Sequence, residues 1–240
     1  MEHEEQISRR YARLPEPDLA ARDAALLVID MQYGDAHRDY GTLRRLAERG
    51  DALPVEYYAA RVETVVVPNI RRLQAAYRAM GLEVIHTRIE SLTRDGRDRS
   101  LQHKSLGIHH LPGSKEAQFL DEVAPQGDEI VLSKTCGGVF NGTNLDYVLN
   151  NLGTQTLVIA GVVTSGCVEL AVRDASDRGF AVVVVEDATA TWSAEMQDAA
   201  MRAMREIYAK VKSTNEVVQR VTAGAPAMAA TSCGTAAFSA

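Results

Sequence analysis

The chain has 240 residues with a formal net charge of −6 at pH 7, and 46% of its residues are hydrophobic. This length suffices for one α/β domain with a sizeable core, and an acidic charge without a basic patch argues against a nucleic-acid binder. No apolar stretch is long enough to cross a membrane, and three cysteines without zinc-site spacing favour a reducing compartment. Because the acidic first residues also lack the apolar part of a secretory signal, we predict a cytoplasmic protein.

The first half of the chain predicts a polar arm followed by alternating strands and helices. An unbroken apolar run at 24–29 predicts a strand at about 24–30 that is buried on both faces. Glycine and charged residues dominate 90–113, which we expect to be an irregular loop or a lid. The other predicted elements are the arm 1–23, a loop at 31–56, a helix at 60–80, a strand at 83–88 and a short helix from Ser114 to Val123.

The second half of the chain continues this alternation. Strands are predicted at 129–133, 156–161, 181–186 and, from a weaker pattern, 210–212; helices are predicted from Thr143 to near Gly153, from Cys167 to about Arg178 and from Ser193 to about Tyr208. Residues 223–240 contain few large apolar side chains and are predicted to be a disordered tail. The alternation implies a three-layer α/β/α fold, with a mostly parallel sheet of about six strands and helices on both faces.

Three chemically capable side chains stand at the ends of predicted strands. Asp30 ends the first strand, Lys134 ends the third, and Cys167 lies in the first turn of the helix that follows the fourth. Each has a simpler explanation by itself: Asp30 and Lys134 as solvated loop residues, Cys167 as a small buried hydrophobe. Together they favour a site, because a parallel sheet brings its carboxyl ends to one edge and a helix N-terminus stabilises a thiolate.

The segments that contain these three residues resemble those of the isochorismatase-like cysteine hydrolases, and the resemblance covers roughly residues 24–221. The matching stretches are 27–32, Lys134 with 140–146, and 161–168, in the family's order. The family includes nicotinamidases, N-carbamoylsarcosine amidohydrolase, ureidoacrylate amidohydrolase and biuret hydrolase. The resemblance implies a hydrolase domain at 24–222, a catalytic triad of Asp30, Lys134 and Cys167, and assembly into a homo-oligomer, either a dimer or a tetramer.

The resemblance also implies a mechanism. The backbone N–H groups of Val163 and Cys167 would bind an oxyanion, and a cis peptide bond is expected between Val162 and Val163. Lys134 would stabilise the thiolate, and Asp30 would carry the thiol proton to the leaving nitrogen. The expected function is cleavage of a C–N bond in a small amide, carbamoyl, ureido or biuret-like substrate through a thioester, with release of ammonia or an amine.

The segment at the second strand argues against a metal. It reads His86-Thr87-Arg88 and lacks the Asp-x-His pattern by which nicotinamidases of the family hold a metal. We therefore expect neither a catalytic metal nor a cofactor. His86 is expected in the core or behind the site, and His109 and His110 on a loop surface, because no other metal-ligand spacing accompanies them.

Five residues near the predicted strand ends are candidates for binding a small-molecule substrate: Gln32, Tyr33, Arg88, Phe140 and Trp192. Trp192 follows a strand end in a loop, which favours a cavity wall. Arg88 could equally be a surface residue and Phe140 a core residue. The His-Thr-Arg ending also resembles biuret-hydrolase members of the family, which favours a ureido or biuret-like substrate.

Two other functions stay open: a nicotinamidase-like deamidase, and a catalytically idle family member that acts as a binding or scaffold protein. The missing Asp-x-His pattern argues against the first, and the full triad argues against the second. The arm carries Ile7, Tyr11 and Leu14 at helical spacing. Such a stripe favours docking on a partner surface and thus supports the expected oligomer.

Overall fold

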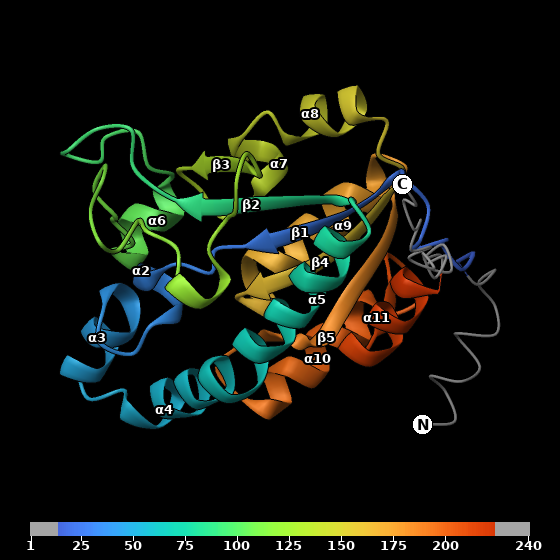
Figure 1. Ribbon diagram of the computed structural model, residues 1–240. Coiled ribbons are helices and arrows are strands. Elements are labelled where there is room, and N and C mark those ends of the chain that lie inside the picture. Colours follow the sequence, from blue (N-terminus) through green and yellow to red (C-terminus); the bar gives the residue numbers. More distant parts are fainter. Residues whose placement is uncertain (1–13, 224–240) are drawn as a thin grey trace, which may run out of the picture.

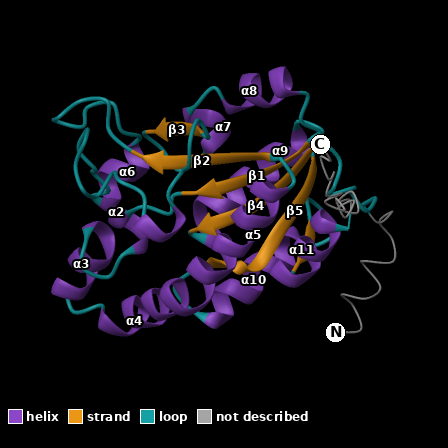
Figure 2. Ribbon diagram, viewed as in Figure 1, coloured by secondary structure: helices purple, strands orange, loops and turns teal. Residues whose placement is uncertain are grey.

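The structure, a computed structural model, describes residues 14–223. Within that range six parallel strands form one sheet in the order β3-β2-β1-β4-β5-β6. The strands are β1 (Ala24–Ile29), β2 (Glu83–Ile89), β3 (Ile130–Lys134), β4 (Thr156–Val162), β5 (Ala181–Ala190) and β6 (Lys210–Lys212). Figure 2 shows the strands as one layer with helices around it. The predicted three-layer α/β/α fold is confirmed.

Helices cover both faces of the sheet (Figure 1). In chain order they are α2 (Tyr33–Ala36), α3 (Gly41–Glu48), α4 (Ala52–Arg61), α5 (Val67–Ala79), α6 (Leu101–Leu106), α7 (Val139–Gly142), α8 (Leu145–Leu152), α9 (Glu169–Asp177), α10 (Ala194–Met204) and α11 (Thr214–Thr222). Because side chains alternate along a strand, Leu26 and Val28 of β1 pack in one core with α4, α5 and α11. Leu27 and Ile29 pack in the other core, with α7, α8, α9 and α10.

Gly161 lets β4 lie directly against the end of β1. It pairs with Ile29, its φ is +116°, and an added Cβ would lie 2.1 Å from the Ile29 carbonyl oxygen. A side chain at this position would collide with backbone, which cannot move aside as a flexible side chain can, so glycine is required. The two central strands therefore end side by side, immediately before Asp30 on one and the turn to Cys167 on the other.

Helical structure begins earlier than predicted after β1. The predicted loop at 31–56 contains α2, α3 and the start of α4, and the helix predicted at 60–80 is part of a longer helical segment. There α4 continues through a π-helical turn, η1 (Val62–Val66), into α5. Pro68 lies in the first turn of α5. A proline ring crowds the carbonyl four residues earlier in a regular α-helix, and the wider π turn lies at that place.

Other predicted boundaries are also wrong. The predicted loop 90–113 contains α6, whose first turn is capped by Ser100 Oγ accepting from His103 N at 3.1 Å. Between Ser114 and Val123 the structure has turns and one 3₁₀ turn, η2 (Asp121–Val123), instead of the predicted helix. Strand β5 continues to Ala190, and α10 ends at Met204, where Arg205 leaves the helical conformation with a ψ of 127°. Helix α11 was not predicted.

The described part of the arm, residues 14–23, packs on its own domain. Leu19 is buried in the core, and Glu16 pairs with Lys212 at 3.1 Å and with Arg220 at 2.7 Å. Ile7, Tyr11 and residues 224–240 lie outside the described range, so the division into arm, domain and tail stays a prediction. None of the helices described is both long and apolar enough to cross a membrane.

Candidate active site

The three residues predicted from strand ends meet at one edge of the sheet. From β1, the chain first adds β2 and β3 on one side of the sheet and then β4, β5 and β6 on the other side, so β1 and β4 flank the switch point. Ligand sites of open parallel sheets lie at such a switch point, beyond the carboxyl ends of the strands. Figure 1 shows the arrowheads of β1, β2 and β3 pointing toward the edge where α2 and α6 lie. Asp30 directly follows β1, Lys134 is the last residue of β3, and Cys167 follows β4 by a short turn.

Asp30 is held in a restricted conformation at the end of β1. Its φ is +53°, in the left-handed region that few residues other than glycine adopt. Only 1% of its surface is exposed, and its Oδ1 accepts a hydrogen bond from Thr87 Oγ1 at 3.1 Å. A non-glycine residue with positive φ persists where surrounding contacts enforce it, and such positions concentrate at functional sites.

Lys134 connects the carboxylate to the thiol. Its ammonium lies 2.7 Å from Asp30 Oδ2 and 3.4 Å from Cys167 Sγ, and it donates to the Cys136 carbonyl at 3.1 Å. The residue is fully buried. The ammonium thus has an acceptor or charge partner on three sides, as a buried charge requires.

Cys167 lies in a π-helical turn, η3 (Thr164–Val168), that leads directly into α9. The turn is tied to β5 and α10, because Thr164 Oγ1 donates to Gln197 Oε1 at 2.8 Å and Ser165 Oγ pairs with Thr191 Oγ1 at 2.8 Å. The Val163 carbonyl accepts from Gly166 N at 2.9 Å. The peptide bond between Val162 and Val163 is cis.

Burial controls the protonation of these three groups. Burial raises the pKa of the Cys167 thiol to about 12, although the Lys134 ammonium opposes this shift. Burial also raises the pKa of Asp30 against the effect of Lys134. Burial disfavours the charged Lys134, but Asp30 and Cys167 outweigh it and raise the lysine pKa above its ordinary value. The resting site therefore holds a neutral thiol beside the lysine ammonium.

A cavity of about 370 Å³ opens onto this group. Its floor includes Asp30, Val163 and Cys167, and Trp192 forms part of a wall, stacked on Tyr58 with ring centroids 4.6 Å apart. The opposite elements, the α2–α3 segment and α6 with the residues after it, contribute Asp35, Thr42, Leu46, Gln102, His103, Leu106 and Ile108. The cavity is large enough for a small amide or urea.

Of the five substrate-binding candidates, only Trp192 lines this cavity. Gln32 is buried and connects loops, with Nε2 donating to the carbonyls of Ile89 and Glu116 at 2.9 Å each. Arg88 pairs with Glu90 at 2.7 Å and donates to Ser133 Oγ at 3.0 Å.

The two remaining candidates have structural surroundings. Tyr33 packs against other rings and has the Lys115 ammonium 3.5 Å from its ring centroid. Phe140 is buried in the core, with the Arg178 guanidinium 4.7 Å from its ring centroid. Both side chains are therefore engaged away from the cavity.

The histidines only partly match their predicted places. His86 is buried and bonds to Glu129 Oε2 at 3.1 Å, as a core histidine should. His110 is 1% exposed and pairs with Asp35 Oδ2 at 2.8 Å, so its predicted loop-surface position is wrong. Within residues 14–223, no group of three or more His, Cys, Asp or Glu side chains is arranged to hold a metal ion.

Sequence reasoning missed two titratable lining residues, Asp35 and His103. His103 is 2% exposed, and burial lowers its pKa to about 4, so the imidazole is neutral. A signal for α6 was present, because Ser100 and Gly107 are a suitable N-cap and C-terminal glycine for a short helix. Asp35 had no comparable signal, since its place depends on how α2 packs.

Comparison with known proteins agrees with this geometry. The family model described as isochorismatase domain matches residues 24–216. The chain belongs to the isochorismatase family. A curated relative, N-carbamoylsarcosine amidase from an Arthrobacter species, is 30% identical over 159 residues, which cover 64% of this chain and 60% of that protein. Ureidoacrylate amidohydrolase from Rhizobium rhizogenes is 27% identical over 230 residues, covering 88% of this chain and 89% of that protein.

Solved structures share this fold. A cysteine hydrolase from Pseudomonas syringae pv. phaseolicola superposes with a TM-score of 0.70 at 24% identity, covering 89% of this chain and 97% of that one. N-carbamoylsarcosine amidase from Thermoplasma acidophilum superposes with a TM-score of 0.61 at 28% identity, covering 80% of this chain and 96% of that one. The curated relatives named here are an amidase and an amidohydrolase, and such enzymes hydrolyse C–N bonds.

Proposed function

We propose that this protein is a cysteine-dependent amidohydrolase that cleaves a C–N bond of a small amide, carbamoyl, ureido or biuret-like substrate. One observation carries the proposal: the buried Lys134 ammonium lies 2.7 Å from Asp30 Oδ2 and 3.4 Å from Cys167 Sγ, and both Asp30 and Cys167 line a cavity. A nucleophile, a proton carrier and a fixed positive charge in contact are the parts that covalent acyl transfer needs. The named activities of the curated relatives support the same reaction class.

The first half of the reaction forms a thioester. Cys167 Sγ attacks the substrate carbonyl carbon while its proton passes to Asp30, whose raised pKa makes it a better base than an ordinary carboxylate. The carbonyl electrons move to oxygen, and the tetrahedral intermediate then expels the nitrogen, which takes the proton from Asp30. The ammonium of Lys134 stabilises the negative charge that develops on sulfur as the proton leaves.

The developing oxyanion needs hydrogen-bond donors near the thiol. Val163 and Cys167 both line the cavity, and we assign their backbone N–H groups to this role. Fixed donors at such a place typically contribute on the order of 3 kcal/mol of transition-state stabilisation. In the second half of the reaction, water attacks the thioester carbon, Asp30 accepts its proton, and the sulfur leaves and regains a proton.

Trapping the thioester tests this mechanism directly. A panel of small amides and ureas is first screened by ammonia release, and the best substrate is mixed with enzyme and quenched in acid. We expect the acyl mass on the peptide that contains Cys167 and none on the peptide that contains Cys136, which serves as an internal control. Turnover that leaves Cys167 unmodified at every quench time would refute a covalent cysteine mechanism.

We also propose that the active unit is a homo-oligomer in the cytoplasm. Leu92 is 75% and Leu101 81% exposed, and burial of such large apolar side chains against a second copy of the chain would stabilise an assembly. The free thiols of Cys136 and Cys167 fit a reducing compartment. Light scattering after size exclusion, on the full chain and on a chain without residues 1–20, measures assembly. A fully active 26.1 kDa monomer would contradict it.

A further inference from the structure

A second buried carboxylate, Asp35, faces the cavity but has no part in the proposed proton transfer. It belongs to α2, the single helical turn after Asp30, and is 8% exposed. Its position is fixed from two sides, because its backbone carbonyl accepts from Tyr58 Oη at 2.8 Å and its Oδ2 pairs with His110 Nε2 at 2.8 Å. Gly34 makes room for this pair, since an added Cβ would lie 2.3 Å from the His110 ring.

The pair keeps Asp35 ionised. Burial alone would raise the pKa of Asp35, but the charge and hydrogen bond of His110, together with the charge of Lys134, outweigh burial and hold that pKa below its ordinary value. Burial alone would lower the pKa of His110, but Asp35 raises it above the ordinary histidine value. A carboxylate that stays charged inside a cavity is an acceptor only, and it strongly favours N–H or O–H groups.

One oxygen of Asp35 retains most of its hydrogen-bonding capacity. Oδ2 is occupied by His110, whereas the partner of Oδ1 is the Thr42 hydroxyl at a long 3.4 Å. A carboxylate oxygen can accept two hydrogen bonds. Oδ1 is therefore available to a ligand in the cavity.

The charged groups around the cavity also favour a ligand that donates hydrogen bonds. Two carboxylates line it, Asp30 and Asp35, and no lysine or arginine is among its described lining residues. Lys134 is paired with Asp30, and the neighbouring Arg45 donates to the Gly107 carbonyl and to Thr42 Oγ1. A substrate carboxylate bound at Asp35 Oδ1 would thus meet a like charge, and the Arg45 guanidinium, although bonded only to neutral groups, is not among the described lining residues that could balance it.

We propose that Asp35 is the specificity-determining residue of this cavity: its Oδ1 accepts N–H groups from the part of the substrate beyond the scissile carbonyl. It thereby selects ureido and amide substrates whose distal nitrogen carries hydrogen, and it rejects substrates with a carboxylate in that place. The inference rests on the proposed amide hydrolysis for the meaning of scissile and distal, but its binding consequence is measurable without turnover.

Two pairs of matched ligands test the inference. Biuret and acetylurea differ by one NH₂ replaced by CH₃, and 3-ureidopropanamide and 3-ureidopropanoate differ by an amide replaced by a carboxylate. Their affinities are measured by calorimetry on Cys167→Ala, which cannot turn them over. We expect biuret to bind at least about tenfold tighter than acetylurea, equal to about 1.4 kcal/mol, and the amide to bind at least about tenfold tighter than the carboxylate.

Asp35→Asn on the same background should weaken both preferences. The asparagine oxygen is expected to stay with His110, so its NH₂ group would face the cavity as a donor. Biuret should then bind less than about twofold tighter than acetylurea. The affinity for 3-ureidopropanoate should rise relative to the affinity for 3-ureidopropanamide. Asp39→Asn is the matched control, because the Asp39 side chain is 75% exposed; it should leave both ratios unchanged.

The outcomes are decisive in each direction. Equal affinities within both pairs, absence of binding of either pair, or unchanged ratios in Asp35→Asn would overturn the proposal. If Asp35→Asn fails to fold, the two ratios in the Cys167→Ala parent decide alone. Ammonia release by the wild-type protein separates the proposed function from the proposed role of Asp35. If the expected affinity ratios are found but no amide is turned over, only the proposed function is contradicted. If biuret is turned over but the affinities within each pair are equal, only the role of Asp35 is contradicted.

Discussion

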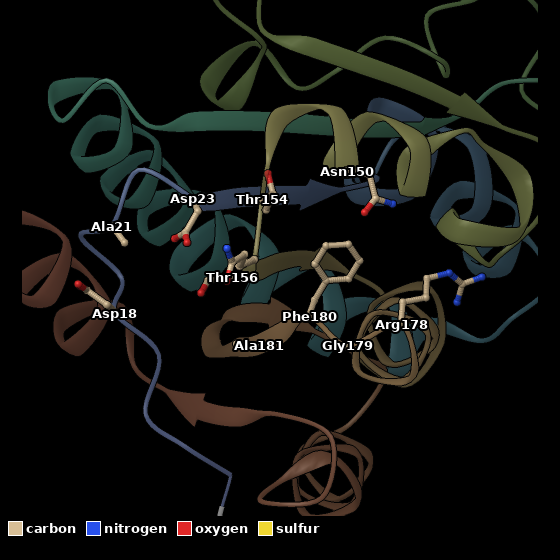
Figure 3. Close-up of a pocket in the computed structure, with 11 residues that line it drawn as sticks. Asp18, Ala21, Asp23, Asn150, Thr154, Thr156, Arg178, Gly179, Phe180 and Ala181 are labelled. Atoms are coloured by element: carbon tan, nitrogen blue, oxygen red, sulfur yellow. The ribbon is translucent and has the colours of Figure 1, made fainter.

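The two edges of the sheet each carry a cavity, and they differ in chemistry more than in size. The amino-edge cavity, about 460 Å³, is larger than the 370 Å³ cavity at the carboxyl edge. Figure 3 shows its lining residues coming from the stretch before β1, from α8 and the start of β4, and from the turn before β5. Of its charged residues, Asp18 and Arg178 are exposed to solvent and Asp23 is partly exposed. At the carboxyl edge, by contrast, Asp30, Asp35 and Lys134 are buried.

This difference shows that hollow volume by itself does not make a reactive site. Water screens the charges at the amino edge, so their interactions are weak. The carboxyl edge holds its charges away from water, where each one strongly affects the proton affinity of its neighbours. The same sheet thus provides one edge suited to chemistry and one whose polar groups serve packing and solubility.

The sharpest test of this contrast substitutes one residue at each edge. Cys167→Ala should reduce turnover at least about 1,000-fold, because the covalent step disappears, while thermal unfolding shifts by no more than about 2–4 °C. Thr154→Ala, in the amino-edge cavity, should change turnover less than about twofold. Steady-state ammonia release and calorimetric melting measure both. Near-normal turnover in Cys167→Ala would remove the chemical difference between the edges.

Lys134→Met should lower both turnover and stability. Turnover should fall by about 100-fold or more, and alkylation of Cys167 should become slower at every pH between about 7 and 9, because Lys134 lowers the thiol pKa. An unchanged alkylation profile would remove Lys134 from this role. Lys134→Arg, which keeps the charge, is the matched control and should retain faster alkylation than Lys134→Met.

The stability loss in Lys134→Met should depend on pH. Without the ammonium, the pKa of buried Asp30 rises further in the folded state. The deficit is therefore small below the ordinary aspartate pKa of about 3.9 and grows as pH rises, toward about 3 kcal/mol near neutrality. Urea unfolding of wild type and variant from about pH 4 to pH 8 measures the difference. A deficit that shrinks with rising pH would contradict the buried ion pair.

Gln197→Ala tests whether the thiol turn depends on its supports from β5 and α10. Gln197 Oε1 accepts from Thr164 Oγ1, and its Nε2 donates to Thr189 Oγ1 at 3.0 Å. Its removal leaves the buried Thr164 hydroxyl unpaired and takes one of two partners from the Thr189 hydroxyl, which should cost about 1–3 kcal/mol of unfolding free energy and lower kcat several-fold. Gln219→Ala, at an exposed position of α11, is the control and should do neither. If Gln197→Ala is destabilised but keeps the wild-type kcat, these hydrogen bonds contribute to stability and not to catalysis.

Metal removal should have the smallest effect of all. Activity is expected to survive dialysis against strong chelators, and elemental analysis should find no stoichiometric zinc or iron. Loss of activity that one metal restores would revive a nicotinamidase-like assignment and would place a metal, rather than buried charge, at the origin of the difference between the two edges.

The sequence predicted the parts of the site that depend on strands and missed those that depend on loop packing. Strands buried on both faces are continuous apolar runs, so the positions of Asp30, Lys134 and Cys167 at their ends followed from pattern. Arg88 shows the limit of that reasoning. Successive side chains of a strand point to opposite faces, and since Thr87 bonds to Asp30, Arg88 points away to Ser133 and Glu90.

The wall opposite the thiol could not be predicted for a different reason. Asp35 and His103 come from short helical segments, α2 and α6, whose positions depend on contacts with distant residues such as Tyr58 and His110. No local periodicity encodes such contacts. The burial that raises the thiol pKa was equally invisible, because it comes from the assembled cavity and not from the residues flanking Cys167.

Gly161 has a consequence for how this protein tolerates mutation. With Ile29 backbone 2.1 Å from any Cβ at that position, every substitution should reduce the amount of folded protein in a cell, whatever its effect on chemistry. Substitutions of Cys167, whose side chain meets the cavity, should leave abundance near normal and abolish activity. A mutational scan that scores abundance and activity separately would therefore place these two positions in different classes. Variants of Gly161 should lose folded protein, and variants of Cys167 should lose activity alone.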